Sequence, residues 1–189
     1  VARAAREQLD NGVTFSLAHP VEMEVAERIV ATVPCAERVR FGKNGSDATA
    51  AAVRLARAHT GRERVAVCGY HGWQDWYIGS TPRHVGVPAG TRALTHTFAY
   101  DDAADLARVL SDHEVAAVVL EPMNVKEPSP GWLEAVRAMA HDNGALLVFD
   151  ETVTGFRFAP GGAQELFGVT PDLAAFGKGL ANGFPLSVV

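Results

Sequence analysis

Apolar runs of strand length alternate along the chain with amphipathic stretches of helix length. Four runs are almost wholly apolar and predict strands over residues 64–69, 115–121, 145–151 and 172–176. Two shorter runs predict further strands over residues 38–41 and 92–98. A strand that is apolar on both sides has to be covered on both faces. The pattern is therefore typical of the α/β class, a mostly parallel sheet with helices on both faces.

Four amphipathic stretches predict the helices that cover this sheet, over residues 22–33, 47–59, 102–110 and 131–143. The predicted inner face of the first helix consists of Val25, Ala26, Ile29, Val30 and Val33. Pro34 ends that helix. Ser46 is the predicted N-cap of the second helix, and Gly61 ends it. The predicted inner face of the second helix consists of Ala48, Ala51, Ala52 and Leu55.

The chain reads as one large α/β domain over residues 35–189, preceded by a helical lead-in over residues 1–34. It starts with Val1 rather than methionine and stops within an apolar run, so we expect the natural polypeptide to continue at both ends. Residues 70–91 fit neither the helix nor the strand period and are rich in Gly, Trp, Pro and His. A loop of that length inside a compact domain usually has a function.

Composition and net charge narrow the classes of molecule that the protein is expected to bind. Of the 189 residues, 48% are hydrophobic and 21% are charged, which is ordinary for a globular domain. The net charge is −5, and no basic stripe or polybasic cluster predicts binding to nucleic acid or to a membrane surface. No apolar run has the roughly 20 residues that a membrane span needs. The two cysteines form no C-x-x-C pair, which favours a reducing, cytoplasmic setting.

Polar residues gather where the predicted strands end. In open α/β sheets, ligands bind beyond the carboxyl ends of the strands. The residues at those ends are Gly45, Ser46, Tyr70, His71, Glu121, Asp150 and Lys178. Their convergence on one edge of the sheet indicates a site more strongly than any one of them does alone.

Two of these positions suggest how a charged ligand is held. Gly45 and Ser46 open a helix, where free N–H groups attract a phosphate, although an ordinary N-cap has the same sequence. Asp150 ends a wholly apolar strand, where an unpaired carboxylate is costly. Its partner is either a protonated pyridine nitrogen or a structural group such as Arg157. No histidine lies at ligand spacing around it, so no metal is predicted.

Lys178 and the Tyr70–His71 pair complete the candidate chemistry. Lys178 lies between two glycines and fits an amine nucleophile with room for a Schiff base; the alternative is a solvated turn lysine. The P-loop pattern is absent. Tyr70 has an aromatic ring that suits stacking on a flat ligand. His71 either touches that ligand or holds the loop.

The ordered motifs together resemble the class III (subgroup II) aminotransferases, which are pyridoxal-phosphate enzymes of fold type I. The matching stretches are residues 44–48 (NGSDA), 70–73 (YHGW), 121–122 (EP), 150–157 (DETVTGFR) and 171–183. Their order, and the DETVTGFR run above all, look most like the glutamate-1-semialdehyde aminomutase branch. The resemblance covers nearly the whole chain and makes residues 35–189 the pyridoxal-phosphate-binding domain.

The resemblance implies a role for each catalytic candidate. Lys178 is similar to the lysine that forms the internal aldimine and later shuttles a proton. Asp150 is similar to the aspartate that pairs with the pyridine nitrogen. Val153 matches the small apolar residue under the ring, and Tyr70 matches the aromatic on the other face.

The remaining cofactor-binding residues also follow from the resemblance. Gly45 and Ser46 match the phosphate-binding turn. His71 and Glu121 are similar to residues near the ring, and Asn124 is expected to reach the ring hydroxyl. Members of this family are homodimers with shared active sites, in which the partner subunit adds a phosphate-binding threonine.

Several functions stay open at this stage. Residues 73–88 and 181–186 look like aminotransferases that use an amino donor and a small carbonyl acceptor, including sugar-like ones. The same site residues fit an intramolecular aminomutase. A non-catalytic homologue that acts as a binding module is a third reading. A nucleotide-binding domain is a weak fourth, because no G-x-G-x-x-G motif follows the first strand. Ser16 and His19 are candidates to face the substrate.

Overall fold

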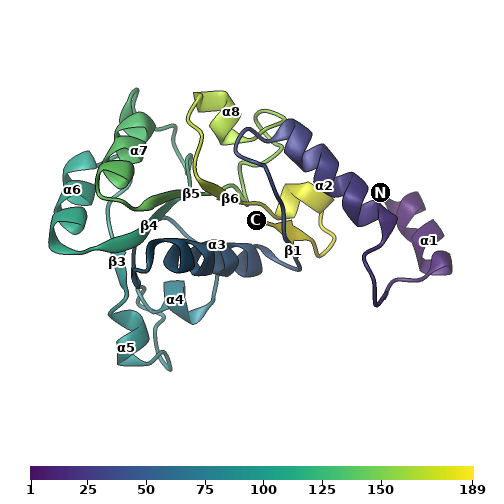
Figure 1. Cartoon of the computed structure of the whole chain (residues 1–189), viewed down its shortest axis with the longest axis horizontal. Helices are drawn as coiled ribbons and strands as arrows, with labels where there is room; N and C mark the ends of the chain where they lie inside the picture. Colours follow the sequence, from purple (N-terminus) through teal and green to yellow (C-terminus); the bar gives the residue numbers. More distant parts are fainter.

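The computed structural model describes all 189 residues and centres on a five-stranded parallel sheet (Figure 1). Its strand order is β3-β2-β4-β5-β6. The strands are β2 (Arg64–Cys68), β3 (Thr95–Thr97), β4 (Val115–Leu120), β5 (Leu146–Asp150) and β6 (Leu173–Ala175). Every residue of β4 is buried, as expected for a central strand covered on both faces. The predicted α/β class is confirmed.

Two short strands extend this sheet beyond β6. β1 (Phe41–Gly42) pairs antiparallel with β7 (Ser187–Val188), and Phe176, just after β6, forms an antiparallel bridge to Val188. Both hydrogen bonds of the bridge are present, at 2.8 Å from Phe176 N to Val188 O and 3.1 Å from Val188 N to Phe176 O. Residues 177–186 therefore form an arch with both ends held in the sheet, which we call the Lys178 arch.

Helices cover both faces of the sheet (Figure 1). α6 (Ala103–Asp112) and α7 (Trp132–Asp142) pack on one face, and α3 (Gly45–Thr60) and α4 (Asp75–Ile78) pack on the other. Successive strand residues join opposite cores, because side chains alternate across a strand. The sheet edge between these layers is left open to hold a site.

The N-terminal helices α1 (Ala2–Asn11) and α2 (Pro20–Thr32) project from the β1–β7 end of the molecule (Figure 1). α1 buries no side chain, whereas α2 and its C-cap dock through Ile29 and Val33. No helix has the length and apolar character that crossing a bilayer requires. A domain boundary at residue 34 stays a prediction.

The start and inner face of α3 differ from the prediction. Asn44, not Ser46, is the N-cap, and it forms a capping box with Asp47. The buried face consists of Ala48, Thr49, Ala52, Val53 and Ala56. Leu55 is 49% exposed, because the residues that face the sheet are spaced by three and four along the helix and Leu55 falls outside this row. Gly61 ends the helix in the left-handed conformation, as predicted.

Some predicted elements are shorter in the structure than expected, and some elements of the structure were not predicted. In α2, Val30 lies on the exposed side rather than on the inner face. The edge strand β3 forms only where Thr95–Thr97 pairs with β2, because the residues before it close a helical turn, α5 (Ala89–Arg92). The elements that the hydrophobic pattern does not predict are α1, α4, α5, α8 (Ala163–Phe167), β7 and the 3-10 helix η1 (Lys178–Ala181).

Candidate active site at the carboxyl edge of the sheet

A hollow of about 270 Å³ lies at the carboxyl edge of the sheet, where the predicted chemistry converges. Its walls come from the start of α3, the loop after β2, the turn after β5 and the Lys178 arch. The lining residues are Asn44, Gly45, Ser46, Thr49, Tyr70, His71, Gly72, Trp73, Asp150, Thr152 and Lys178. Six of the nine predicted site residues are in this set; Glu121, Asn124 and Val153 are not.

The start of α3 forms one wall through close backbone packing. A Cβ on Gly45 would lie 2.8 Å from Thr152 Cγ2, and a Cβ on Gly72, where φ is +98°, would overlap Ser46. Ser46 Oγ also accepts the Trp73 N–H at 3.4 Å. The first N–H groups of a helix have no acceptor within the helix, so this wall is suited to an anion.

Asp150 and His71 form a buried pair at the floor of the hollow. Asp150 Oδ2 lies 2.9 Å from His71 Nδ1, and Thr152 N donates to Asp150 Oδ1 at 3.1 Å. The two side chains are 1% and 0% exposed. The predicted alternative partner of Asp150, Arg157, makes no ion pair with it. The cost of burying the carboxylate is thus offset by His71 and a backbone N–H.

The other ring nitrogen of His71 also has a partner. His71 Nε2 lies 2.9 Å from the Cys68 carbonyl oxygen. Both ring nitrogens are therefore bonded within the fold, which fixes the orientation of the imidazole beside Asp150.

Lys178 reaches the hollow from the first turn of the Lys178 arch. Its backbone has φ +41°, a left-handed value that is uncommon for a residue with a side chain. Its side chain is exposed and makes no hydrogen bond or ion pair with the chain. The amine is therefore free to react with a ligand, and its turn is one of the strained conformations that occur at functional sites.

Glu121 and Asn124 lie behind the hollow rather than in it. Glu121 Oε2 accepts the Tyr70 N–H at 3.1 Å and the Asn124 side-chain amide at 2.8 Å. Burial raises the pKa of Glu121. The Asn124 side-chain oxygen accepts the Val125 N–H at 2.7 Å. The Asn124 amide group has a second N–H beside the one bonded to Glu121, so the expected contact with a ring hydroxyl stays a prediction. Glu121 positions the backbone of Tyr70.

The position predicted for Val153 is occupied by Thr152. Thr152 is 9% exposed and lines the hollow, whereas Val153 is 41% exposed and does not. The reason is the turn after β5, in which the Thr152 N–H bonds back to Asp150 and its side chain lies against Gly45. The small residue at this face of the hollow is therefore a threonine.

Comparison with known proteins places the chain in a family. A profile of class-III aminotransferases matches residues 1–189. The chain belongs to the class-III aminotransferase family.

Its relatives carry several activities. It is 39% identical over 204 residues to a glutamate-1-semialdehyde 2,1-aminomutase of Methanothermobacter thermautotrophicus, covering 100% of this chain and 49% of the relative. It is 38% identical over 188 residues to a 3-aminobutyryl-CoA aminotransferase of Cloacimonas acidaminovorans, covering 95% of this chain and 45% of that one. The chain thus spans about half the length of these relatives.

Solved structures have the same fold. An omega-transaminase from Sphaerobacter thermophilus superposes with a TM-score of 0.92 at 31% identity, over 99% of this chain and 48% of its own. A glutamate-1-semialdehyde aminomutase from Pseudomonas aeruginosa superposes with a TM-score of 0.83 at 27% identity, over 99% and 44%. The fold is that of fold type I transaminases, as the sequence motifs predict.

Five residues that line the hollow are not among the predicted site residues: Asn44, Thr49, Gly72, Trp73 and Thr152. Thr49 is 1% exposed, and its hydroxyl lies 3.2 Å from the Ser46 carbonyl and 3.0 Å from the His71 carbonyl. It therefore joins the start of α3 to the loop after β2. A polar residue inside an otherwise alanine-rich helix face is the signal that could have identified it.

Glu151 has a structural role beside the site. It is fully buried and accepts the N–H groups of Ala163 at 2.7 Å and Gln164 at 3.0 Å, at the start of α8. Thr154 also donates to it. The carboxylate therefore fixes the turn after β5, and with it Asp150 and Thr152.

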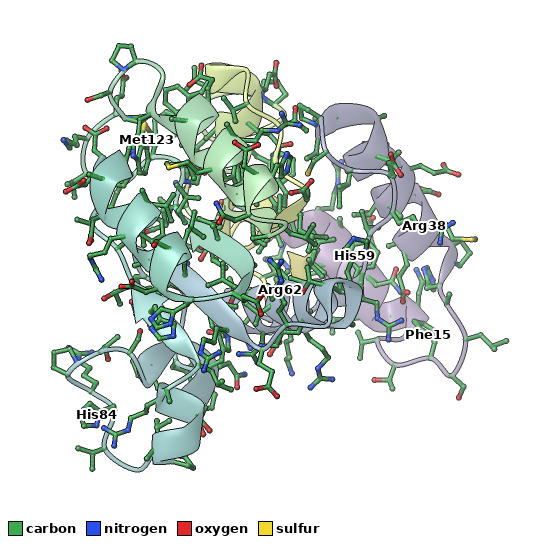
Figure 2. The ribbon with its side chains drawn as sticks, turned by 60° about the vertical axis from the view of Figure 1, so that its left-hand side comes forward. Phe15, Arg38, His59, Arg62, His84 and Met123 are labelled. Carbon is green, nitrogen blue, oxygen red and sulfur yellow. The ribbon has the colours of Figure 1, made fainter.

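Ser16 and His19 do not reach the hollow. They line a separate shallow depression between α1 and α2. His19 caps α2 by accepting the Val21 N–H at 3.2 Å, and its ring packs against Phe15 at 4.9 Å. Figure 2 shows Phe15 at the outer side of the molecule, away from α6 and α7.

The two cysteines are not candidates for the nucleophile. Burial raises the pKa of Cys35 to about 11. Burial, with the nearby Glu121 charge, raises the pKa of Cys68 to about 12. Since the thiolate is the reactive form, both side chains act as small core residues.

Proposed function

We propose that this protein is a pyridoxal-phosphate-dependent aminotransferase that moves an amino group between an amino donor and a small carbonyl acceptor. One observation carries the proposal: the free amine of Lys178 and the buried Asp150–His71 pair line the same hollow. An amine nucleophile and a paired carboxylate are what a pyridine aldehyde cofactor requires. The family membership and the transaminases among its structural neighbours support the same activity.

The residues of the hollow fit pyridoxal phosphate. Gly45 and Gly72 let Thr152 and Ser46 pack directly against the backbone, and the first turn of α3 supplies N–H groups for a phosphate. At the opposite wall, Asp150 is buried and hydrogen-bonded to His71, and it lines the hollow, where it would pair with a ring nitrogen. When bound, the cofactor supplies the electron sink that stabilises negative charge next to the amine-bearing carbon.

The residues of the hollow would then divide the work. Lys178 would hold the cofactor covalently and carry a proton to and from the substrate. Asp150 would pair with the ring nitrogen, and His71 positions Asp150. Tyr70 and Thr152 would hold the ring, with Thr152 in the role predicted for Val153.

Assembly and location follow the family resemblance. We infer a homodimer with shared active sites, in which the partner adds a phosphate-binding threonine. A cytoplasmic location is supported by the two free cysteines. Both inferences are tested directly, by mass measurement in solution and by fractionation of the native cells.

An aminomutase is the second candidate, because the relative that is 39% identical over the whole chain carries that name. The two activities use the same Lys178 and Asp150, and differ in their need for a second substrate. Product analysis separates them. With an amino donor alone, an aminotransferase releases at most one keto product per site and needs an amino acceptor for further turnover, whereas a mutase isomerises glutamate-1-semialdehyde repeatedly without a second substrate.

Covalent attachment at Lys178 tests the proposed function. The full-length protein is incubated with pyridoxal phosphate, reduced with borohydride and digested. We expect the peptide that contains Lys178 to carry the added mass and Lys178→Ala to lose both the label and turnover. Arg54→Gln, an exposed and unpaired cation on α3, is the control and should keep both. Full turnover in Lys178→Ala would overturn the proposal. Absence of label in the parent protein would favour a non-catalytic binding module.

A further inference from the structure

A second hollow, of about 460 Å³, adjoins the hollow described above, which we call the cofactor hollow, and shares Lys178 with it. It is formed by the loop before α3, the turn after β5 and the Lys178 arch. Its lining residues are Lys43, Asn44, Gly45, Arg157, Lys178, Gly179, Asn182, Gly183, Phe184, Pro185 and Leu186. The two hollows share Asn44, Gly45 and Lys178. A molecule that reacts next to Lys178 therefore borders both.

The charge of this second hollow is one-sided. Lys43, Arg157 and Lys178 contribute three cations, and no aspartate or glutamate lines it. None of the three side chains forms a hydrogen bond or an ion pair with another group of the chain. Asp47 lies near Lys43, but one of its carboxylate oxygens accepts two backbone N–H groups, each at 3.0 Å. Like charges that face one space without a counter-charge attract an anion to it.

Arg157 is presented to this hollow by a rigid turn. The Gly155 N–H bonds to the Glu151 carbonyl at 2.8 Å, and the Phe156 ring packs on Phe176 at 5.2 Å. The guanidinium lies beside the arch, since a Cβ on Gly179 would be 3.7 Å from Arg157 Nε. A planar guanidinium is the group best suited to bind a carboxylate through two parallel hydrogen bonds.

The opposite wall sets the kind of anion. Phe184, Pro185 and Leu186 give it an apolar side, and the Asn182 amide has no partner within the chain. Asn182 is held in the left-handed conformation at φ +49°, at the end of the 3-10 helix. A carboxylate on a short aliphatic chain matches cations and an amide on one side and apolar groups on the other.

We propose that this second hollow is a subsite for the carboxylate of the amino donor or of the keto-acid acceptor, with Arg157 and Lys43 as its binding residues. The identity of the ligand rests on the proposed aminotransferase function. The substrate class is then a carboxylic acid with its reacting carbon next to Lys178 and its carboxylate directed toward Arg157. Simple amines without a carboxylate leave this subsite empty.

Binding of glutarate, an unreactive dicarboxylate, to the full-length holoenzyme tests the proposal by calorimetry. We expect Arg157→Gln to weaken glutarate binding about 10- to 100-fold, since hydrogen bonds to a charged group are lost. Lys43→Gln should weaken it less, and Arg54→Gln should leave it unchanged. Added salt should weaken binding to the parent more than to Arg157→Gln. A Kd for Arg157→Gln equal to that of Arg54→Gln overturns the proposal.

Two further measurements separate this subsite from the cofactor and from the proposed function. Cofactor content, measured as the borohydride label on Lys178, should be unchanged in Arg157→Gln and Lys43→Gln. If the variants lose that label or the binding of inorganic phosphate instead of glutarate, the second hollow serves the cofactor phosphate, and the subsite proposal is wrong. If the parent binds glutarate through Arg157 but takes up no label, the proposed function fails while the anion site stands.

Turnover of a matched substrate pair provides the functional readout. 4-Aminobutyrate and butylamine have the same chain, with a carboxylate in one replaced by a methyl group in the other. Arg157→Gln should lower kcat/KM for the acid about 10- to 100-fold and leave the amine within a few-fold. An equal loss for both substrates would mean that Arg157 only supports the turn after β5, which contradicts the proposal.

Discussion

Asp150 and Arg157 are the first and last residues of one sequence motif, yet their side chains differ in burial and in hydrogen bonding. Asp150 is buried, and both of its oxygens already have partners in His71 and Thr152. Arg157 is exposed at a hollow and has no partner for its guanidinium. The cofactor hollow and the second hollow thus differ in whether their polar groups are satisfied before any ligand binds.

This difference separates groups that are built into the fold from groups that wait for a ligand. A buried carboxylate must be paired during folding, because an unpaired charge in the interior costs several kcal/mol. An exposed cation is hydrated, so it can stay unpaired until an anion binds. Substitutions on the Asp150 side should therefore change stability, and those on the Arg157 side should change binding alone.

The largest effect on stability is expected for His71→Phe. It removes the partner of Asp150 and leaves a buried carboxylate with one N–H donor, at a cost of about 3–5 kcal/mol in unfolding free energy. Chemical denaturation measures the loss. Arg157→Gln is the matched control on the other hollow and should change the same quantity by less than about 0.5 kcal/mol. Equal losses for the two variants would remove the distinction between the hollows.

A smaller effect is expected for Thr49→Val, which has the same shape but no hydroxyl. The buried carbonyl of His71 and the partly buried carbonyl of Ser46 lose the hydroxyl donor that they share. The expected cost is about 1–2 kcal/mol, seen as a lower Tm and a weaker affinity for pyridoxal phosphate. Thr49→Ser keeps the hydroxyl and should recover most of both. A Tm for Thr49→Val equal to that of the parent would show that this residue does not join the start of α3 to the loop after β2.

The smallest effect is expected for Glu121→Gln and depends on pH. Burial raises the pKa of Glu121 in the folded state, so its ionisation costs stability once the pH rises through the unfolded and then the folded pKa. The variant still accepts the Tyr70 N–H and avoids that cost. Its Tm should slightly exceed that of the parent at neutral pH and equal it below about pH 4, where both side chains are neutral. A variant that is less stable at neutral pH would contradict this account.

The sequence predicts best those parts of the molecule that depend on local pattern. β4 is read directly from the chain, because a strand buried on both faces needs an apolar residue at every position. Lys178 and Asp150 are also found, because each follows or ends such a strand. In the same way, Gly61 marks the end of α3, since the left-handed C-cap favours glycine.

Where contacts between distant segments decide, the sequence is less informative. The Glu121–Tyr70 hydrogen bond joins residues 51 apart in the chain, and no local pattern indicates it. The prediction of Val153 comes from the family resemblance, which matches residues along the motif. In the structure the Thr152 N–H bonds back to Asp150, and this turn brings the Thr152 side chain to the hollow.

The Lys178 arch, anchored by Phe176 on one side and Val188 on the other, has a consequence for reaction rate. An amine on a freely moving tail would sample a large volume and meet the floor of the hollow seldom. Because both ends of the arch are hydrogen-bonded into the sheet that also carries Asp150, the amine is confined to a small volume beside that carboxylate. Such confinement raises the effective molarity of the nucleophile. Part of the entropy that the reaction would otherwise lose is lost when the chain folds.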